Sequence, residues 1–302
     1  MKKILVIGAT GMLGTMVSEV LSKSNGIDLA ITTRSKNDIQ ESLGCKSFFF
    51  DAKGNYKEQL NAIFSEFIPD YIVNCIGIIK PYCNDNNQGG VYDAIKVNSL
   101  FPRELSNYIN EKRVATKIMQ IATDCVFDGT TGKYTERAPH NPTDVYGKSK
   151  SLGEVISDNF LNIRSSIIGP ELNNHLSLLD WFLSQETRVF GFTHHLWNGV
   201  TTLQFAQLCL DIISNEKFEE LRNLNHTLHY IVNKDVTKYE LLNIFNNTFN
   251  TDKEIVATSS IGVPIDRTLR SNFLNIELGS MEDAIKELST YIEHSILFKN
   301  KF

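Results

Sequence analysis

A continuous apolar run that ends in a glycine-rich turn opens the chain and constrains its fold most strongly. Residues 2–14 read KKILVIGATGMLG, and the apolar part lacks the polar alternation of a half-buried strand. Such a run is typical of a parallel strand that is buried on both faces. After the turn, Met12, Met16 and Val20 recur at helical spacing. The sequence therefore predicts a strand, a tight turn and a helix.

Strand and helix patterns continue to alternate along the first 170 residues. Apolar strand patterns occur at 27–35, 46–52, 70–79, 115–129 and 160–170, and helical patterns at 56–69, 92–112 and around Tyr146. This alternation predicts an α/β fold with a parallel, doubly wound sheet of the Rossmann type.

The alternation weakens after Pro170, and a second region begins there. Helices are expected at 175–186, 201–215, 237–249 and 280–296, with one late strand at 227–233. A chain of 302 residues suits about two domains. We expect a nucleotide-binding domain at 1–168, to which 196–233 returns, and a smaller C-terminal α/β lobe, mainly 169–302, for the substrate.

Composition excludes several classes of partner. The net charge of −5 argues against nucleic acid or an anionic membrane surface, both of which require basic patches. No apolar run reaches the roughly 18 to 20 residues of a membrane span, so no membrane association is expected. The cysteines are scattered without a CxxC pair, which predicts neither a metal site nor a disulfide framework. Free thiols are typical of a reducing cytoplasm, the expected location.

The glycine turn predicts a dinucleotide site. In doubly wound sheets the first strand–helix turn holds pyrophosphate, because glycines allow close backbone approach and the helix supplies free N–H groups. A turn that only packs tightly is the alternative, but the position after the first strand favours the nucleotide. The candidates in this turn are Gly8, Thr10, Gly11, Met12 and Leu13.

The end of the second strand bears on the choice of nucleotide. An acid about 20 residues beyond the glycines would bind the ribose of NAD, but Arg34 stands there, followed by Ser35 and Lys36. A guanidinium pairs well with the 2′-phosphate of NADP. A surface arginine in a turn is the alternative. NADPH is therefore the expected cofactor, and NADH stays open.

Tyr146 and Lys150 lie four residues apart in NPTDVYGKSKSLGE and would share one face of a helix. Alone, the pair could be a packed tyrosine beside a solvated lysine. Beside a nucleotide turn, it predicts proton delivery, because a neighbouring ammonium lowers the phenol pKa from its usual value of about 10. Thr123 ends a central strand, where ligands bind, and could donate to a substrate carbonyl.

Four motifs together resemble a known family. GATGMLG, NCIG, ATDCVFDG and YGKSK with a following GE are similar to the extended short-chain dehydrogenase/reductases, and most to the dTDP-4-dehydrorhamnose reductase branch. The resemblance is strong over the nucleotide domain and weak beyond it. It implies a Rossmann fold, NADPH, a nucleotide-sugar substrate, a role in deoxysugar and polysaccharide biosynthesis, and Thr123, Tyr146 and Lys150 as catalytic residues. The further cofactor-binding residues that it implies are Asp51, Cys75, Ile76, Gly77 and Asn98.

The substrate side departs from the family pattern. Dehydratases of the superfamily carry Asp-Glu after the threonine, whereas Asp124 and Cys125 stand here, so dehydration is not expected. The resemblance places Asp124 and Phe127 with Cys125 at the sugar pocket. Ile167 replaces a tryptophan that lines that pocket in the rhamnose-type reductases, which leaves the identity of the sugar open.

Cys125 raises an alternative activity. GDP-fucose synthases, which epimerise and then reduce, carry a catalytic cysteine at this position and a histidine beyond a Gly-Pro turn, as His175 follows Pro170 here. A small buried thiol and a loop histidine form the simpler interpretation, because buried free cysteine is common.

Three functions follow from these residues. The leading hypothesis is NADPH-dependent reduction of the keto group of a nucleotide-linked 4-keto-6-deoxysugar, with Tyr146 as the proton donor. The second is a 3,5-epimerase/4-reductase that uses Cys125 and His175. The third is a non-catalytic regulatory subunit, like the methionine adenosyltransferase beta subunit. The sequence does not fix the oligomeric state, and a homodimer is compatible with it.

Overall fold

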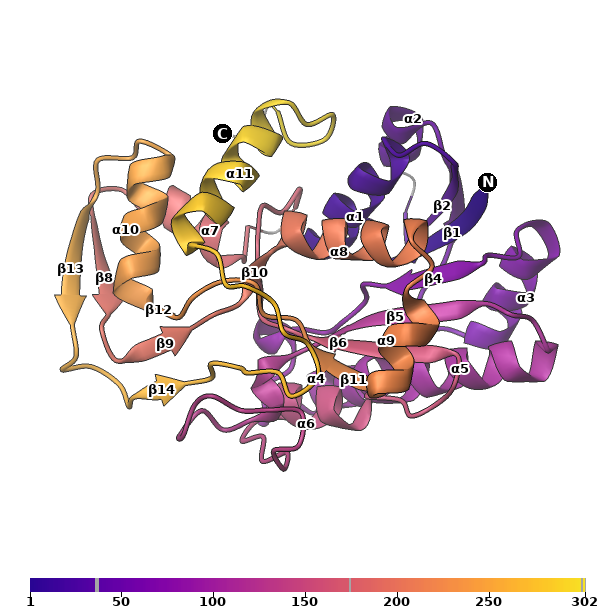
Figure 1. Ribbon diagram of the computed structural model, residues 1–302, viewed down its shortest axis with the longest axis horizontal. Coiled ribbons are helices and arrows are strands. Elements are labelled where there is room, and N and C mark those ends of the chain that lie inside the picture. Colours follow the sequence, from indigo (N-terminus) through magenta and orange to yellow (C-terminus); the bar gives the residue numbers. More distant parts are fainter. Residues whose placement is uncertain (36–37, 174, 300, 302) are drawn as a thin grey trace.

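A seven-stranded parallel sheet forms the centre of the protein, with helices on both faces and a smaller lobe at one end (Figure 1). The computed structural model describes residues 1–35, 38–173, 175–299 and 301. The strand order β11-β6-β5-β4-β1-β2-β3 confirms the doubly wound α/β fold. Its strands are β1 (Lys2–Ile7), β2 (Ile27–Thr33), β3 (Lys46–Phe49), β4 (Tyr71–Asn74), β5 (Lys117–Ala122), β6 (Phe160–Arg164) and β11 (Thr227–His229).

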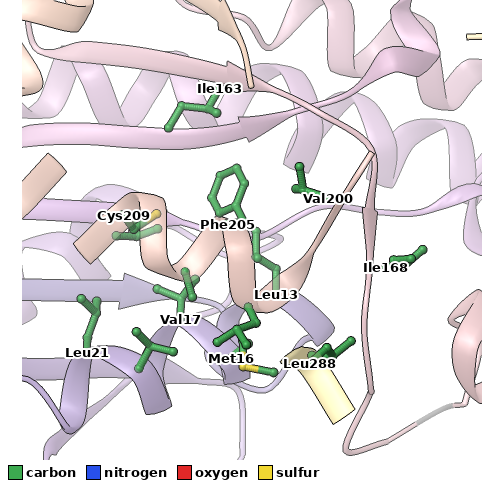
Figure 2. Close-up of a cluster of buried hydrophobic side chains, with 14 of the residues drawn as sticks. Leu13, Met16, Val17, Leu21, Ile163, Ile168, Val200, Phe205, Cys209 and Leu288 are labelled. Atoms are coloured by element: carbon green, nitrogen blue, oxygen red, sulfur yellow. The ribbon is translucent and has the colours of Figure 1, made fainter. Parts of the chain in front are cut away.

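Strand β1 shows why the opening run is apolar throughout. Ile4 and Val6 belong to one hydrophobic core and Leu5 and Ile7 to another, so both faces of the strand are buried. Helices α1 (Met12–Ser22) and α8 (Thr202–Ser214) lie side by side over the first core (Figure 2). The other helices of this part are α2 (Ile39–Leu43), α3 (Tyr56–Glu66), α4 (Gln88–Ala94), α5 (Phe101–Lys112), α6 (Val145–Leu152) and α9 (Phe218–Leu224).

The chain leaves the central sheet after β6 and later returns to it. The strand expected at 160–170 is divided: β6 ends at Arg164, and β7 (Ile167–Ile168) pairs with β10 (Val200–Thr201) instead. Helix α8 then packs against α1, and β11 pairs in parallel with β6. Residues 202–229 are thus part of the central layers.

The lobe consists of short strands with helices and connecting segments around them. The strands β12 (Val236–Thr237), β9 (His195–Trp197) and β14 (Ile265–Asp266) form one sheet, and β8 (Arg188–Phe192) pairs with β13 (Glu254–Thr258). Helices α7 (Leu178–Ser184), α10 (Lys238–Thr248) and α11 (Met281–Glu293) pack beside them. Among the described residues, no helix combines the length and apolarity needed to cross a membrane.

Candidate active site

Helix α6 carries two of the expected catalytic residues, and its first turn is fixed from outside. Asp144 caps the helix by accepting a hydrogen bond from the N–H of Gly147 at 2.8 Å. The same carboxylate forms an ion pair with Lys80 at 2.7 Å. Because cap and ion pair act on the residues that flank Tyr146, the phenol enters the site at a fixed angle.

Gly147 allows α6 to lie directly against the loop after β5. A Cβ atom at this position would come within 2.2 Å of the carbonyl oxygen of Cys125. Close approach of the two backbones brings Tyr146 beside Thr123, whose hydroxyl acts to lower the Tyr146 pKa. Burial has the larger effect and raises the Tyr146 pKa above its ordinary value. The sequence predicted a lowered pKa; burial instead holds the phenol protonated, as a proton donor requires.

Thr123 organises the turn that follows β5. Its hydroxyl donates to the Asp124 carboxylate at 3.1 Å and accepts from the N–H of Cys125 at 3.2 Å. All three side chains thus come from one 3₁₀ turn, residues 124–126 with Thr123 as its cap.

Lys150 lies one turn beyond Tyr146 and is buried. Its ammonium donates to the carbonyl oxygen of Ile121 at 2.7 Å, and no carboxylate among the described residues lies within ion-pair distance of it. Burial lowers the Lys150 pKa to about 8, while the charges of Glu154 and Cys75 act in the opposite direction. The ammonium can therefore lose its proton close to neutral pH, at the end of β5.

The glycine turn has the geometry of a phosphate cradle. Gly8 has a φ of +88°, and a Cβ on Gly14 would come within 2.1 Å of the Gly8 carbonyl oxygen. Gly11 precedes α1, and no side chain caps the helix. The N–H groups of Met12 and Leu13 at the first turn have no acceptor within the helix. These free donors, with the glycine backbone, fit the pyrophosphate of a dinucleotide.

The residues expected to contact the rest of the cofactor follow neighbouring strands along the same edge of the sheet. Arg34 directly follows β2 and is exposed, and Lys36 lies outside the described residues. Asp51 follows β3 and accepts a hydrogen bond from the N–H of Lys53 at 3.0 Å. Cys75 follows β4, and its N–H donates to the Ile7 carbonyl at 3.0 Å. The four strand ends thus line one edge.

Asn98 ties the loop after β4 to helix α6. Its side chain accepts from the N–H of Ile78 at 2.8 Å and donates to the Ile78 carbonyl at 2.9 Å and to Ser149 at 3.0 Å. Ile76 and Gly77 lie in this loop, between Cys75 and Ile78, the residue that Asn98 binds. Asn98 belongs to a π-helical segment, Ile95–Leu100, between α4 and α5. Such segments are frequent at functional sites, whereas the sequence predicted one regular helix at 92–112.

Cys125 and Phe127 have different surroundings. Cys125 is half-buried beside Tyr146, and burial raises its thiol pKa to about 12, so the thiol stays protonated. Phe127 is fully buried and stacks on Tyr134 with ring centroids 4.3 Å apart. It therefore supports the catalytic loop from behind and has no surface for a ligand, in contrast to its expected place in the pocket.

Ile167 and His175 both lie where the chain passes from the central sheet into the lobe. Ile167 is half-buried in β7 and packs against the large core. His175 is exposed, and its Nδ1 lies 3.3 Å from the Asp180 carboxylate. His175 and Asp180, together with Lys301, border a separate cavity of about 400 Å³. Among the described residues, no contact joins His175 to Cys125.

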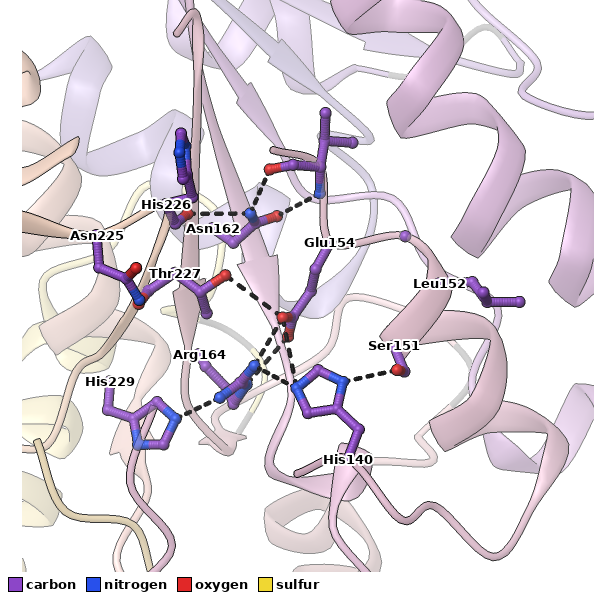
Figure 3. A network of polar contacts seen from close by, with 12 residues as sticks. His140, Ser151, Leu152, Glu154, Asn162, Arg164, Asn225, His226, Thr227 and His229 are labelled. Atoms are coloured by element: carbon purple, nitrogen blue, oxygen red, sulfur yellow. Dashed lines mark hydrogen bonds and ion pairs between the residues drawn. The ribbon is translucent and has the colours of Figure 1, made fainter. Parts of the chain in front are cut away.

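A buried polar network behind Phe127 was not predicted from the sequence (Figure 3). The Arg164 guanidinium binds both carboxylate oxygens of Glu154, at 3.0 and 2.6 Å. It also reaches His140 at 2.7 Å and His229 at 2.5 Å. The guanidinium lies 5.2 Å from the centroid of the Phe127 ring. The network thus connects the end of α6 with β6 and β11.

His229 is held neutral in this network. Its Nδ1 donates to the Arg270 carbonyl at 2.8 Å, so that Nε2 can accept from Arg164. Burial and the Arg164 charge lower the His229 pKa to about 4. The only sequence signal was a charged residue, Arg164, inside an apolar strand pattern, which predicts a buried partner but does not identify it.

Comparisons with known proteins agree with this geometry. The family model described as "RmlD substrate binding domain" matches residues 1–282. Methionine adenosyltransferase 2 subunit beta of Danio rerio is 28% identical over 266 residues, covering 82% of this chain and 74% of that protein. The dTDP-4-keto-6-deoxy-D-glucose reductase of Streptomyces niveus is 30% identical over 151 residues, 50% of this chain and 45% of its own length.

A solved structure extends the likeness to the fold. The dTDP-4-dehydrorhamnose reductase of Bacillus anthracis in complex with NADP superposes with a TM-score of 0.71 at 18% identity, and the match covers 95% of this chain and 99% of that one.

Proposed function

This chain belongs to the RmlD substrate-binding domain family, and we propose that it reduces the keto group of a nucleotide-linked 4-keto-6-deoxysugar with NADPH. The observation that carries the proposal is the placement of Tyr146 beside Thr123 at the end of β5, at the same edge of the sheet as the glycine turn. The S. niveus relative and the B. anthracis structure are both named as reductases of such sugars. The activity, the substrate and the cofactor are all part of the proposal.

The side chains can divide the reduction between them. The nicotinamide, when bound, supplies the hydride to the ketone carbon. Tyr146 donates its proton to the carbonyl oxygen, so that the carbonyl becomes a secondary alcohol. The Thr123 hydroxyl, whose proton Asp124 accepts in the structure, turns to that oxygen to orient and polarise it beforehand. Lys150, with a pKa of about 8, replaces the proton on the tyrosine and then recovers one from solvent.

The choice of NADPH over NADH rests on Arg34. It lies at the end of β2, where no acid competes for the ribose, and its exposed guanidinium is free to approach a 2′-phosphate. The B. anthracis structure contains NADP, which is consistent with this choice.

The function is tested by NADPH oxidation in the presence of a panel of nucleotide-linked 4-ketosugars that vary in base and sugar. We expect turnover of at least one member, with the 4-hydroxy sugar as the product by mass spectrometry. Oxidation without any ketosugar, or no turnover with the whole panel while NADPH binds, would contradict the proposal.

A non-catalytic subunit is the second candidate, because the relative named methionine adenosyltransferase 2 subunit beta matches 82% of this chain. The two candidates differ in the need for Tyr146. A subunit without activity would retain its binding to another enzyme in Tyr146→Phe, whereas a reductase would lose turnover.

The epimerase hypothesis gains no support from the described residues. His175 pairs with Asp180, and the protonated thiol of Cys125 is a poor base. We therefore expect no deuterium at C3 or C5 of the sugar after turnover in heavy water. Deuterium that disappears in Cys125→Ser would restore the hypothesis.

A further inference from the structure

The small sheet β12-β9-β14 places three basic residues beside one another. Ile265 pairs with His195, and Thr237 pairs with Leu196. Because β12 and β9 are antiparallel, this register places Lys238, one position after Thr237, opposite His195. Arg267, two positions after Ile265, lies on the same side. Burial lowers the His195 pKa, the hydrogen bond to Val263 opposes this, and the charges of Lys238 and Arg267 are among those that lower it further.

This basic face of the lobe meets the catalytic loop. Arg267 donates to the carbonyl oxygens of Phe127 and Asp128, at 3.1 and 3.2 Å. Phe127 directly follows the turn that carries Asp124 and Cys125, and both of these groups interact electrostatically with Lys238. Lys238 and Arg267 therefore lie beside the turn that carries Asp124 and Cys125.

Lys238 has no protein partner there. Within the described part of the chain it makes no hydrogen bond and has no carboxylate within 4 Å, although it is half-buried. Burial lowers its pKa to about 8, and the charges of Asp124 and Cys125 act against this. A half-buried cation without a partner is costly. Asp124 does not relieve this cost at contact distance, since its carboxylate accepts from Thr123.

A second group in this part of the lobe is also unsatisfied. Both ring nitrogens of His194 are buried without a hydrogen-bond partner among the described residues. The ring lies 4.7 Å from that of His195, centroid to centroid. Buried polar groups are normally paired, so an exception next to a site indicates a missing ligand.

We propose that Lys238, assisted by Arg267, binds an oxyanion group of the substrate. The proposal rests on the proposed function, since a sugar linked to a nucleoside diphosphate carries two phosphate groups. Two sources share this chemistry: the diphosphate of the nucleotide, and a carboxylate on the sugar, which would replace the C6 methyl group of the proposed 6-deoxysugar. An ammonium on a flexible stem suits either, because it acts as a point charge rather than a planar fork.

The test compares wild type with Lys238→Met, which keeps the length of the side chain and removes its charge, and with Lys238→Arg, which restores the charge. Lys234→Met is the matched control, because Lys234 is an exposed lysine four positions earlier. Calorimetric titrations use dTDP, inorganic pyrophosphate, UDP-glucose and UDP-glucuronate, all with saturating NADP⁺ so that the phosphate cradle at α1 is filled. Thermal unfolding of each variant verifies that it is folded.

We expect Lys238→Met to bind at least one of these probes about ten-fold or more weakly, the usual loss for one charge-assisted hydrogen bond. Weaker dTDP and pyrophosphate binding assigns the group to the diphosphate. A loss limited to UDP-glucuronate, with UDP-glucose unaffected, assigns it to a sugar carboxylate. Lys238→Arg should recover most of the affinity, and Lys234→Met should resemble wild type.

Equal affinity of wild type and Lys238→Met for every probe overturns the proposal, and so does the absence of binding of every probe to wild type. These outcomes are distinct from failure of the proposed function, which is read from ketosugar turnover. A protein that never oxidises NADPH but loses dTDP binding in Lys238→Met retains the anion site and lacks the reductase activity.

Discussion

Two buried cations, Lys150 and Arg164, have very different partners in this fold. Arg164 has Glu154 as a bidentate partner and two histidines as further acceptors. Lys150 has a single backbone carbonyl, that of Ile121, and its pKa falls to about 8. Both side chains are almost fully inaccessible, so burial alone does not distinguish them.

The difference separates a cation that holds the structure from one that is available for chemistry. A paired and hydrogen-bonded charge is fixed in one protonation state, because its partner would be left unsatisfied without it. A charge with one weak acceptor can be lost or gained near neutral pH, which proton transfer requires. Arg164 therefore fixes the end of α6, and Lys150 is the cation that we propose to support Tyr146.

The largest expected effect is on turnover, at Tyr146. Tyr146→Phe removes the proton donor and should reduce turnover by a factor of about 10² to 10⁴, while NADPH binding and the melting temperature stay close to wild type. Steady-state NADPH oxidation with a turned-over ketosugar measures this. Tyr82→Phe, at a half-exposed tyrosine, is the control. Near-normal turnover of Tyr146→Phe would show that Tyr146 is not the proton donor.

The second effect is on stability and separates the two cations directly. Arg164→Met leaves the Glu154 carboxylate buried without its partner, and we expect a loss of about 3 to 5 kcal/mol in the free energy of unfolding. Lys150→Met leaves only the Ile121 carbonyl without its donor. We expect it to lower the free energy of unfolding by less than about 1 kcal/mol net, because it also removes a buried charge. Urea unfolding of both variants measures the difference. Similar losses in the two variants would show that the pairing does not matter.

The same residues show which features of the site and the fold can be predicted from the sequence. The glycine turn and the Tyr146–Lys150 pair were predictable because their function depends on local spacing, which one strand–turn–helix unit or one helical turn fixes. The doubly wound sheet followed from strands whose apolar pattern is set by burial on both faces.

The partners of Arg164 were beyond reach because they are long-range contacts: His229 lies 65 positions away and is brought in by the pairing of β11 with β6. The strands of the lobe were missed because β12 and β14 have two residues each, and pairing rather than an intrinsic pattern stabilises them. The tendency of burial to raise the Tyr146 pKa likewise depends on tertiary packing that no local motif specifies.

The third effect concerns pH. The Lys150 pKa is about 8 when folded, against an ordinary value of 10.5, so between these pH values the unfolded chain binds more protons. The destabilising burial of the ammonium is fully present below pH 8 and is relieved as pH rises to 10.5. The stability of wild type relative to Lys150→Met should therefore rise by about 3 kcal/mol over this window. Lys238 shows the same direction of shift but is present in both proteins, so it cancels. A flat difference across the window would show that Lys150 is not desolvated.

The smallest effect belongs to Arg34, an exposed cation that extends the comparison to a third environment. Solvent already satisfies its guanidinium, so Arg34→Ala should leave the free energy of unfolding within about 0.5 kcal/mol of wild type. Its contribution should emerge only when a 2′-phosphate is bound. We expect the preference for NADPH over NADH to narrow by about 1 to 3 kcal/mol, the range for charge-assisted hydrogen bonds, with NADH affinity unchanged. Arg113→Ala, at an exposed arginine after α5, is the control. Titration of both cofactors against the three proteins decides, and equal affinities of wild type for NADPH and NADH would contradict the assignment of Arg34.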